Sequence, residues 1–240
     1  MTTEKEPVFQ FPLALLAVES ECKSALQRIV DFCLVNVAVN LAEDDPVGLE
    51  HLERARKLLN VSVPAPEHSL REGKKLRAQY LGGTPDAWVR VKAGWLWGCH
   101  NDDAPSWPEF RVLCGVYSVI GEKPFARVSA ESLRFRSAGA RSKAVWDLAK
   151  HHPLLGEKEV RLVVDRLELR GFFARFCYRR RITFYSNKLG RDELAKLALA
   201  YCEGNRAKLA EMRKQDAAKS GVAEGRTEGE QRADIISGAT

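Results

Sequence analysis

The stretch that decides the fold reads LGEKEVRLVVDRLELRGFFARFCYRRRITFYS, residues 155–186. Apolar side chains at positions i, i+3, i+4 and i+7 predict a helix with one buried side, formed by Val160, Val163, Val164 and Leu167. Gly171 follows as a helix stop. Two short aromatic and β-branched runs, 172–178 and 182–185, then predict a hairpin whose tight link holds Arg179, Arg180 and Arg181.

Part of this stretch, VVDRLELRGFFARF at 163–176, resembles the winged helix-turn-helix regulators, and the MarR-like group in particular. In that group a DRLExRG helix end precedes an apolar pair and a basic strand. The matching residues here are Asp165, Arg166, Leu167, Glu168, Arg170, Gly171, Phe172 and Phe173. The resemblance implies a helix that reads duplex DNA, a wing behind it and a flanking helix that forms a homodimer. The alternative is that the helix and the hairpin only cover a hydrophobic core and do not read DNA.

Charge is concentrated around the same stretch. Residues 123–191 hold seventeen Lys and Arg against six Asp and Glu, a net of +11, whereas the remaining residues hold 21 against 26, a net of −5. A basic segment within an otherwise acidic chain favours a polyanionic partner. Basic segments also occur on proteins that bind no nucleic acid, so the charge supports the DNA interpretation without deciding it.

Composition narrows the class of protein. No apolar run reaches the length of a membrane span and residues 1–7 lack a signal-peptide core, so we expect a cytoplasmic protein without a membrane partner. The six cysteines form no CxxC pair, and we expect them to be reduced. His100, Asp102 and Asp103 could be drawn as metal ligands, but no second cluster supports them, so we expect no metal and no cofactor.

The predicted fold class is mainly α, with α+β character at the wing. A flexible lead at 1–10 precedes a helical domain at 11–98, and a loop at 99–107 links this helical domain to a second domain. Within the helical domain we expect two helices in 11–42 and further helices at 49–59 and 68–81. The tryptophan-rich run 88–97 fits both a helix and a strand, and we interpret its three tryptophans as packing residues.

The second domain, a winged helix-turn-helix, is predicted at 108–190. It would begin with a helix at 108–120 and a short strand at 125–128 that pairs with the wing. Ser129 and Ser142 are expected to cap two short helices, 130–138 and 143–151.

The remaining C-terminal residues are predicted to form a helix and a tail. In the helix, at 191–218, an apolar stripe of Leu194, Leu197 and Tyr201 would serve dimerisation. The tail at 219–240 is predicted to be disordered because it is rich in Gly, Glu, Ala and Ser.

Two helix-turn-helix arrangements compete within the second domain. In the preferred one, residues 142–152 form the supporting helix and 157–170 enter the major groove. In the other, 130–138 support and 142–152 read, with Val145 and Leu148 turned inward. The first needs a slightly long link, whereas the second has Phe135 where a small residue is usual.

The predicted DNA contacts come from the preferred arrangement. The outward side of the reading helix carries Lys158, Arg161, Leu162, Asp165 and Leu169. An arginine there can grip guanine, and an apolar side chain can contact a thymine methyl group. Further cations are expected on phosphates, namely Arg141, Lys143, Arg175, Arg179, Arg180 and Arg181.

The sequence contains no catalytic motif, so we expect no enzyme. The five histidines lie beside no nucleophile motif, and no glycine-rich phosphate loop is present. The function that fits best is sequence-preferring binding of duplex DNA by a homodimeric regulator of transcription, or of plasmid or phage replication. The leading alternative is a winged-helix scaffold that uses the same face against protein, since Leu162 and Leu169 are more apolar than a groove requires. The sequence identifies no small-molecule ligand.

Overall fold

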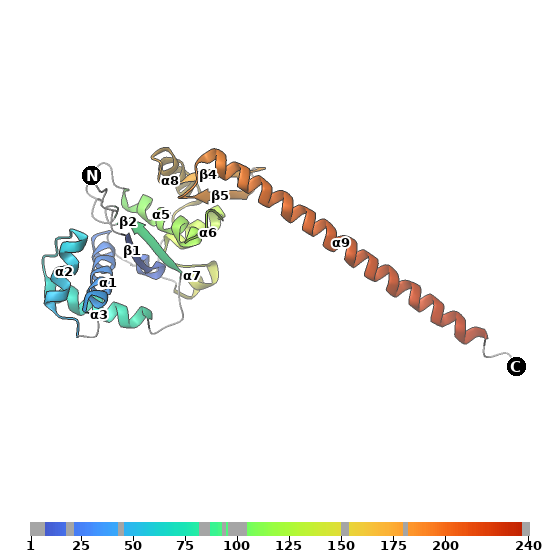
Figure 1. Ribbon diagram of the computed structural model, residues 1–240, viewed down its shortest axis with the longest axis horizontal. Helices are drawn as coiled ribbons and strands as arrows, with labels where there is room; N and C mark the ends of the chain where they lie inside the picture. The colour runs from blue at the N-terminus through green and yellow to red at the C-terminus, as the bar shows by residue number, and fades with distance from the viewer. Residues whose placement is uncertain are drawn as a thin grey trace. The chain divides into compact units, whose positions relative to one another are not determined.

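The computed structural model describes residues 8–17, 22–42, 46–81, 87–92, 95, 105–149, 154–179 and 182–236. The chain divides into two compact units, Met1–Leu194 and Ala195–Thr240. The described residues are mostly helical with two small antiparallel sheets, which confirms the coarse prediction of a mainly α or α+β protein (Figure 1). None of the described helices is long and apolar enough to cross a lipid bilayer.

The described part of the first unit begins with a strand that spans the end of the predicted flexible lead and the start of a predicted helix. Strand β1 (Val8–Pro12) is followed by the short helix η1 (Leu13–Leu16), and β1 pairs antiparallel with β2 (Trp88–Lys92) in the register Phe9 to Val91 and Phe11 to Val89. The prediction of two helices within 11–42 was therefore wrong at its start. Alternating buried and exposed positions in VFQFP fit a strand, but its partner lies about eighty residues away.

The described residues of this N-terminal part also form the helices α1 (Cys22–Ala42), α2 (Leu49–Leu59) and α3 (Pro66–Leu81). Helix α1 packs against both others. The crossing of α1 and α3 is close at Gly73, where an added Cβ atom would lie 2.4 Å from the backbone oxygen of Asp31. The Asp31 carboxylate is buried there and accepts a 2.8 Å hydrogen bond from Gln27 Nε2. Burial raises the pKa of Asp31, although hydrogen bonds from Ser69 and Gln27 oppose the shift.

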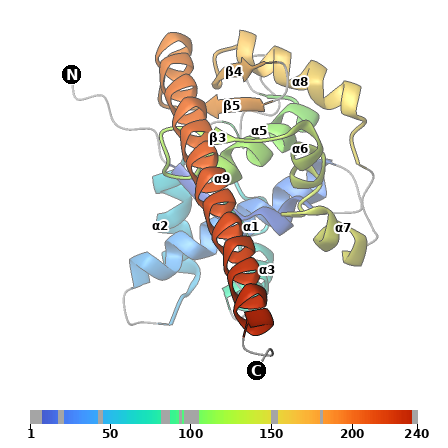
Figure 2. The same cartoon turned by 90° about the vertical axis from the view of Figure 1, so that its right-hand side faces the viewer.

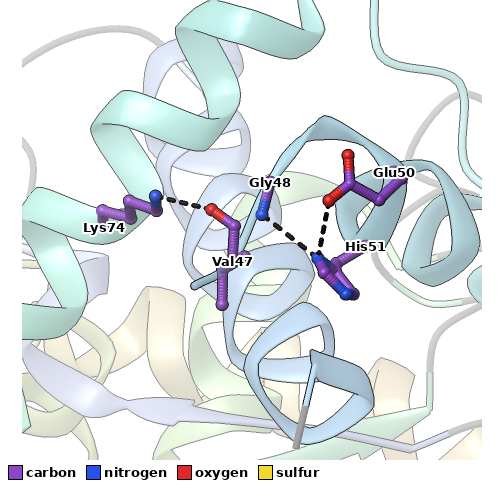
Figure 3. Close-up of polar contacts among 5 residues, drawn as sticks. All are labelled: Val47, Gly48, Glu50, His51 and Lys74. Carbon is purple, nitrogen blue, oxygen red and sulfur yellow. Dashed lines mark hydrogen bonds and ion pairs between the residues drawn. The ribbon is translucent and has the colours of Figure 1, made fainter. Parts of the chain in front are cut away.

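Polar contacts fix the loop that leads into α2 (Figure 3). The backbone N–H of Gly48 donates to Nδ1 of the buried His51 at 3.2 Å, and the Glu50 carboxylate lies 3.3 Å from the same nitrogen. From α3, Lys74 Nζ donates to the carbonyl oxygen of Val47 at 2.7 Å. These bonds satisfy the start of α2 and tie the loop to α3.

The C-terminal part of the first unit contains four helices and three strands among its described residues. Its elements are α5 (Trp107–Ile120), β3 (Ala126–Arg127), α6 (Ala130–Ser137), α7 (Lys143–Ala149), α8 (Glu157–Leu169), β4 (Ala174–Tyr178) and β5 (Ile182–Ser186). The strands form one antiparallel sheet in the order β3-β5-β4. Pairing of Ala126 with Tyr185 confirms the predicted short strand beside the hairpin. Ser129 caps α6 as predicted, because its side chain accepts a hydrogen bond from the Ser132 N–H.

Helix α5 belongs to both hydrophobic cores of the first unit. Its Phe110 and Cys114 pack with β1, β2 and the N-terminal helices, whereas Leu113 and Val116 pack with α6, α8 and the sheet. The two parts also meet at Gly139, where an added Cβ atom would lie 2.7 Å from the Cβ atom of Ala17. The division into domains at 11–98 and 108–190 stays a prediction, and most of the predicted linker at 99–107 lies outside the described residues.

Helix α9 (Arg191–Ile236) begins where the sequence places it and continues beyond the predicted end at 218. The residues predicted to be disordered, 219–240, are thus helical as far as Ile236. Alanine, glutamate, arginine and glutamine in this stretch are good helix formers, whereas its glycines were the compositional reason for the prediction of disorder. The side chains beyond 215 and residues 237–240 lie outside the part of the chain that the structure describes.

Candidate nucleic-acid interface

Helix α8 presents one face to the core and the other to solvent. The predicted apolar stripe is confirmed, since Val160, Val163, Val164 and Leu167 are all buried. The residues predicted to face outward are all exposed, namely Lys158, Arg161, Leu162, Asp165 and Leu169. Figure 2 shows α8 beside the β4–β5 hairpin.

Helix α6 packs against α8, as α5 does, and the described residues of α7 do not share their core. Leu133 of α6 lies in the same core as Val160 and Val164, whereas no described residue of α7 belongs to that core. Leu148 of α7 is 86% exposed, which contradicts its predicted inward position. Phe135 of α6 contacts Trp146 of α7 at 5.9 Å between ring centroids. The described residues of α7 therefore do not take the predicted role of supporting α8, and α7 lies between α6 and α8 in the chain.

The β4–β5 hairpin carries the basic link. Tyr178 pairs with Ile182, so three residues join the strands. The first of them, Arg179, is exposed, has a positive φ of 50° and holds its guanidinium group 5.3 Å from the Tyr178 ring centroid. Arg180 and Arg181 lie outside the described residues.

Two of the predicted DNA-contacting arginines already have carboxylate partners. Arg161 forms an exposed ion pair with Glu157, one turn earlier on α8. Arg175 on β4 lies 2.7 Å from both Asp165 and Glu168 of α8. Burial alone would lower the pKa of Arg175, but the hydrogen bond to Asp165 and the charge of Glu168 outweigh it and raise the pKa. The two ion pairs of Arg175 hold β4 against α8, and all three pairs together bring the charge of this surface close to neutral.

Arg170, which the resemblance placed at the helix end, has a structural role. Its guanidinium group lies 2.8 Å from Glu109, a residue that is largely buried in the first turn of α5. Glu109 also accepts a 2.9 Å hydrogen bond from the backbone N–H of Ser106. This ion pair joins the C-terminal end of α8 to the N-terminal end of α5.

Two further predicted contacts, Arg141 and Lys143, are exposed at the start of α7. Figure 2 shows α6 between α7 and α8. The structure therefore does not bring Arg141 and Lys143 to the exposed face of α8.

A hollow of about 750 Å³ lies between α6, α8 and the sheet, and sequence reasoning missed it. The hairpin register offered a signal, because Arg175 pairs with Tyr185 and Cys177 with Thr183, which places all four on one face. Arg161, Glu157 and Glu168 of α8 form the opposite wall. Acidic and basic groups thus share this hollow in similar number.

No family model matches the chain, and neither do curated proteins or solved structures. Among the described residues no group of three His, Cys, Asp or Glu side chains is placed to hold a metal ion. The predicted residues His100, Asp102 and Asp103 lie outside that part of the chain. The arrangement that the described residues offer is an exposed helix beside a basic hairpin, suited to binding through charge and shape.

Proposed function

We propose that the C-terminal part of the first unit is a winged helix-turn-helix that binds duplex DNA. The observation that carries this proposal is the order α5, β3, α6, α7, α8, β4, β5, with α7 as an extra helix between α6 and α8, together with the sheet order β3-β5-β4, in which the short strand pairs with the second hairpin strand. In this proposal α6 is the supporting helix, α8 is the reader helix and the β4–β5 hairpin is the wing. The MarR-like sequence pattern ends the reader helix and begins the wing.

The distribution of charge supports different roles for the proposed wing and reader helix in DNA binding. Phosphate contacts hold a protein on the duplex, whereas contacts to base edges select the sequence. The link at 179–181 supplies three adjacent cations in a tight turn, where they suit phosphates. On the reader helix Lys158 and Arg161 face outward, and the ion pair with Glu157 orients Arg161 along the helix surface. We therefore expect the wing to supply much of the affinity and the reader helix the preference.

We further propose that the protein acts as a homodimeric regulator, without a cofactor and without catalysis of its own. Leu197 of α9 is 40% exposed and Tyr201 is 52% exposed, and in this proposal both contact a second copy of the chain. Leu194 is fully buried in the single chain, which corrects the expectation that it belongs to the dimer stripe. A twofold dimer would present two reader helices to a pseudo-palindromic site.

A second candidate function is a protein-binding scaffold that uses the same face of α8. The observation that favours it is the exposure of Leu162 and Leu169, at 58% and 87%, on a helix whose charges are nearly balanced. In this alternative the two leucines would enter a groove on a protein partner.

A gel-shift experiment with random duplex pools at several salt concentrations tests the first proposal against the second. If about four to six phosphates are neutralised, the logarithm of the binding constant should fall with the logarithm of salt concentration at a slope of roughly −4 to −5. The Leu162→Ser/Leu169→Ser variant should keep this slope, because the leucines contact no phosphate. Absence of binding at low salt would reject the DNA proposal and favour the scaffold.

A further inference from the structure

A second concave site lies away from the exposed face of α8 and from the hairpin link. It is a hollow of about 270 Å³ between β2, the turn after α5 and the turn after β5. The residues that matter for its chemistry are Arg90, Lys92, Trp95, Tyr117, Glu122 and Lys188. Segments about a hundred residues apart in the sequence therefore meet here, and none of these residues was predicted to contact DNA.

Among the described residues that line this hollow, three carry a positive charge and one is a carboxylate. The alternation of β2 buries Val89 and Val91 in the core, so Arg90 and Lys92 point outward. Lys188 Nζ donates to the backbone oxygen of Glu122 at 2.5 Å, a contact that positions the ammonium group without neutralising it. Within the described part of the chain, neither Arg90 nor Lys188 forms an ion pair with a carboxylate. The hollow therefore favours an anion.

The remaining wall is aromatic and rigid. The Trp95 ring packs edge to face with Tyr117 and Phe172, at centroid distances of 5.4 and 5.2 Å. The Tyr117 hydroxyl donates to the carbonyl oxygen of Phe172 at 3.0 Å, and burial raises the pKa of Tyr117 to about 12, so the hydroxyl keeps its proton. Lys92 Nζ lies over one face of the half-buried Trp95 ring, 5.9 Å from its centroid, which leaves the other face for a planar ligand in our proposal.

We propose that this hollow binds a single nucleotide, with the phosphate held by Arg90 and Lys188 and the base against Trp95. A planar base stacks on an aromatic side chain whatever its sequence, and arginine and lysine are the usual phosphate ligands. The volume lies just below the range of roughly 300–1,000 Å³ that is typical of larger ligands, so the hollow suits one nucleotide. Its source is either a free nucleotide or an unpaired residue of a single strand. Paired bases in a duplex are stacked and are not available to it.

The experiment titrates the full chain with deoxyadenosine monophosphate and follows binding by calorimetry and by tryptophan fluorescence. We expect saturable binding with quenching, competition by inorganic phosphate, and much weaker binding of deoxyadenosine, which lacks the phosphate. The Arg90→Gln/Lys188→Gln variant should bind at least roughly tenfold more weakly, because each lost cation removes a charge-assisted hydrogen bond. Lys57→Gln, at an exposed lysine of α2, is the control that should leave affinity unchanged.

Further arms separate the source of the nucleotide and the independence of the site. If short oligodeoxyadenylate binds more tightly than the mononucleotide and loses affinity in the same double variant, the ligand is a single strand. If the oligodeoxyadenylate does not compete with the mononucleotide, the ligand is a free nucleotide. The double variant should keep its gel shift on duplex DNA, so failure of the nucleotide site is distinguishable from failure of the DNA proposal. Absence of saturable binding at millimolar concentrations, or equal affinity of the double variant and Lys57→Gln, would overturn the inference.

Discussion

Arg175 on β4 donates to Asp165 on α8, with its Nη2 atom 2.7 Å from Oδ1 of the aspartate. The same nitrogen lies 2.7 Å from Oε2 of Glu168. A cation that the sequence assigns to phosphate is therefore held by two carboxylates of its own chain. The two ion pairs of Arg175 hold β4 against α8. They therefore set the spacing between the two surfaces proposed to contact DNA.

We predict that Arg175→Ala destabilises the fold by roughly 1 kcal/mol, because it leaves the partly buried Glu168 and the exposed Asp165 without their partner. Arg161→Ala removes an exposed ion pair of the same helix and should cost less than about 0.5 kcal/mol. Urea denaturation of both variants measures the free energy of unfolding. Equal stability of the two variants would show that Arg175 does not fasten the hairpin.

Stability should also depend on pH through Asp31. Burial raises the pKa of this carboxyl above its usual value of 3.8, so the folded state binds its proton more readily than the unfolded state does. Its contribution to stability is then fully present below pH 3.8 and is lost as the pH rises through the pKa of the folded state. Asp31→Asn removes the charge and should be more stable than the wild type at pH 7.

Urea denaturation of both proteins at a series of pH values checks this prediction. The advantage of Asp31→Asn should shrink as the pH is lowered and disappear in acid. Gln27→Ala is a useful companion, because it removes a hydrogen bond that stabilises the ionised carboxylate and should destabilise the protein most at neutral pH. A stability difference between wild type and Asp31→Asn that does not change with pH would contradict the assignment.

The predictions that succeeded came from local sequence patterns. The stripe from Val160 to Leu167, the cap at Ser129 and the strand beside the hairpin depend on spacing within a few residues. The failures involve contacts between distant residues. The sequence around Phe11 fits an apolar helix, and only its pairing with Val89 shows that it is a strand. Leu148 likewise fits an inward position, but Leu133 of α6 occupies the core beside α8. The ion pair of Arg175 with Asp165 was likewise invisible, because the hairpin register decides which arginine faces α8.

Assembly through α9 predicts a second measurable change. If Leu197 and Tyr201 bury against a second copy, the wild type should sediment as a dimer, and Leu197→Asp should yield a folded monomer. Analytical ultracentrifugation gives the mass, and far-UV circular dichroism reports the fold. Leu58→Asp, at an exposed leucine of α2, is the matched control and should remain dimeric. A dimer that survives Leu197→Asp would place the interface elsewhere.

The wing is predicted to contribute affinity without preference. Replacing Arg179, Arg180 and Arg181 by alanine removes three cations, so binding should weaken by a similar factor on every duplex. The salt slope should become less steep by roughly 3. Gel shifts with several unrelated duplexes at several salt concentrations measure both effects. An unchanged slope would mean that the link does not lie on phosphate.

The reader helix should show the opposite behaviour, and Arg161 is the residue that tests it. Its ion partner Glu157 lies one turn earlier, so the guanidinium group is oriented along the exposed face, where it can meet a base edge. Arg161→Ala should cost about 1–3 kcal/mol at one base position and relax the preference there. Glu157→Gln keeps Arg161 and removes a repulsive charge, so it should tighten binding to all duplexes while leaving the preferred site intact. Selection of preferred sites from a random pool compares the wild type with both variants and with Lys143→Ala on α7. A change of preferred sequence in Lys143→Ala but not in Arg161→Ala would make α7 the reader and remove α8 from the major groove.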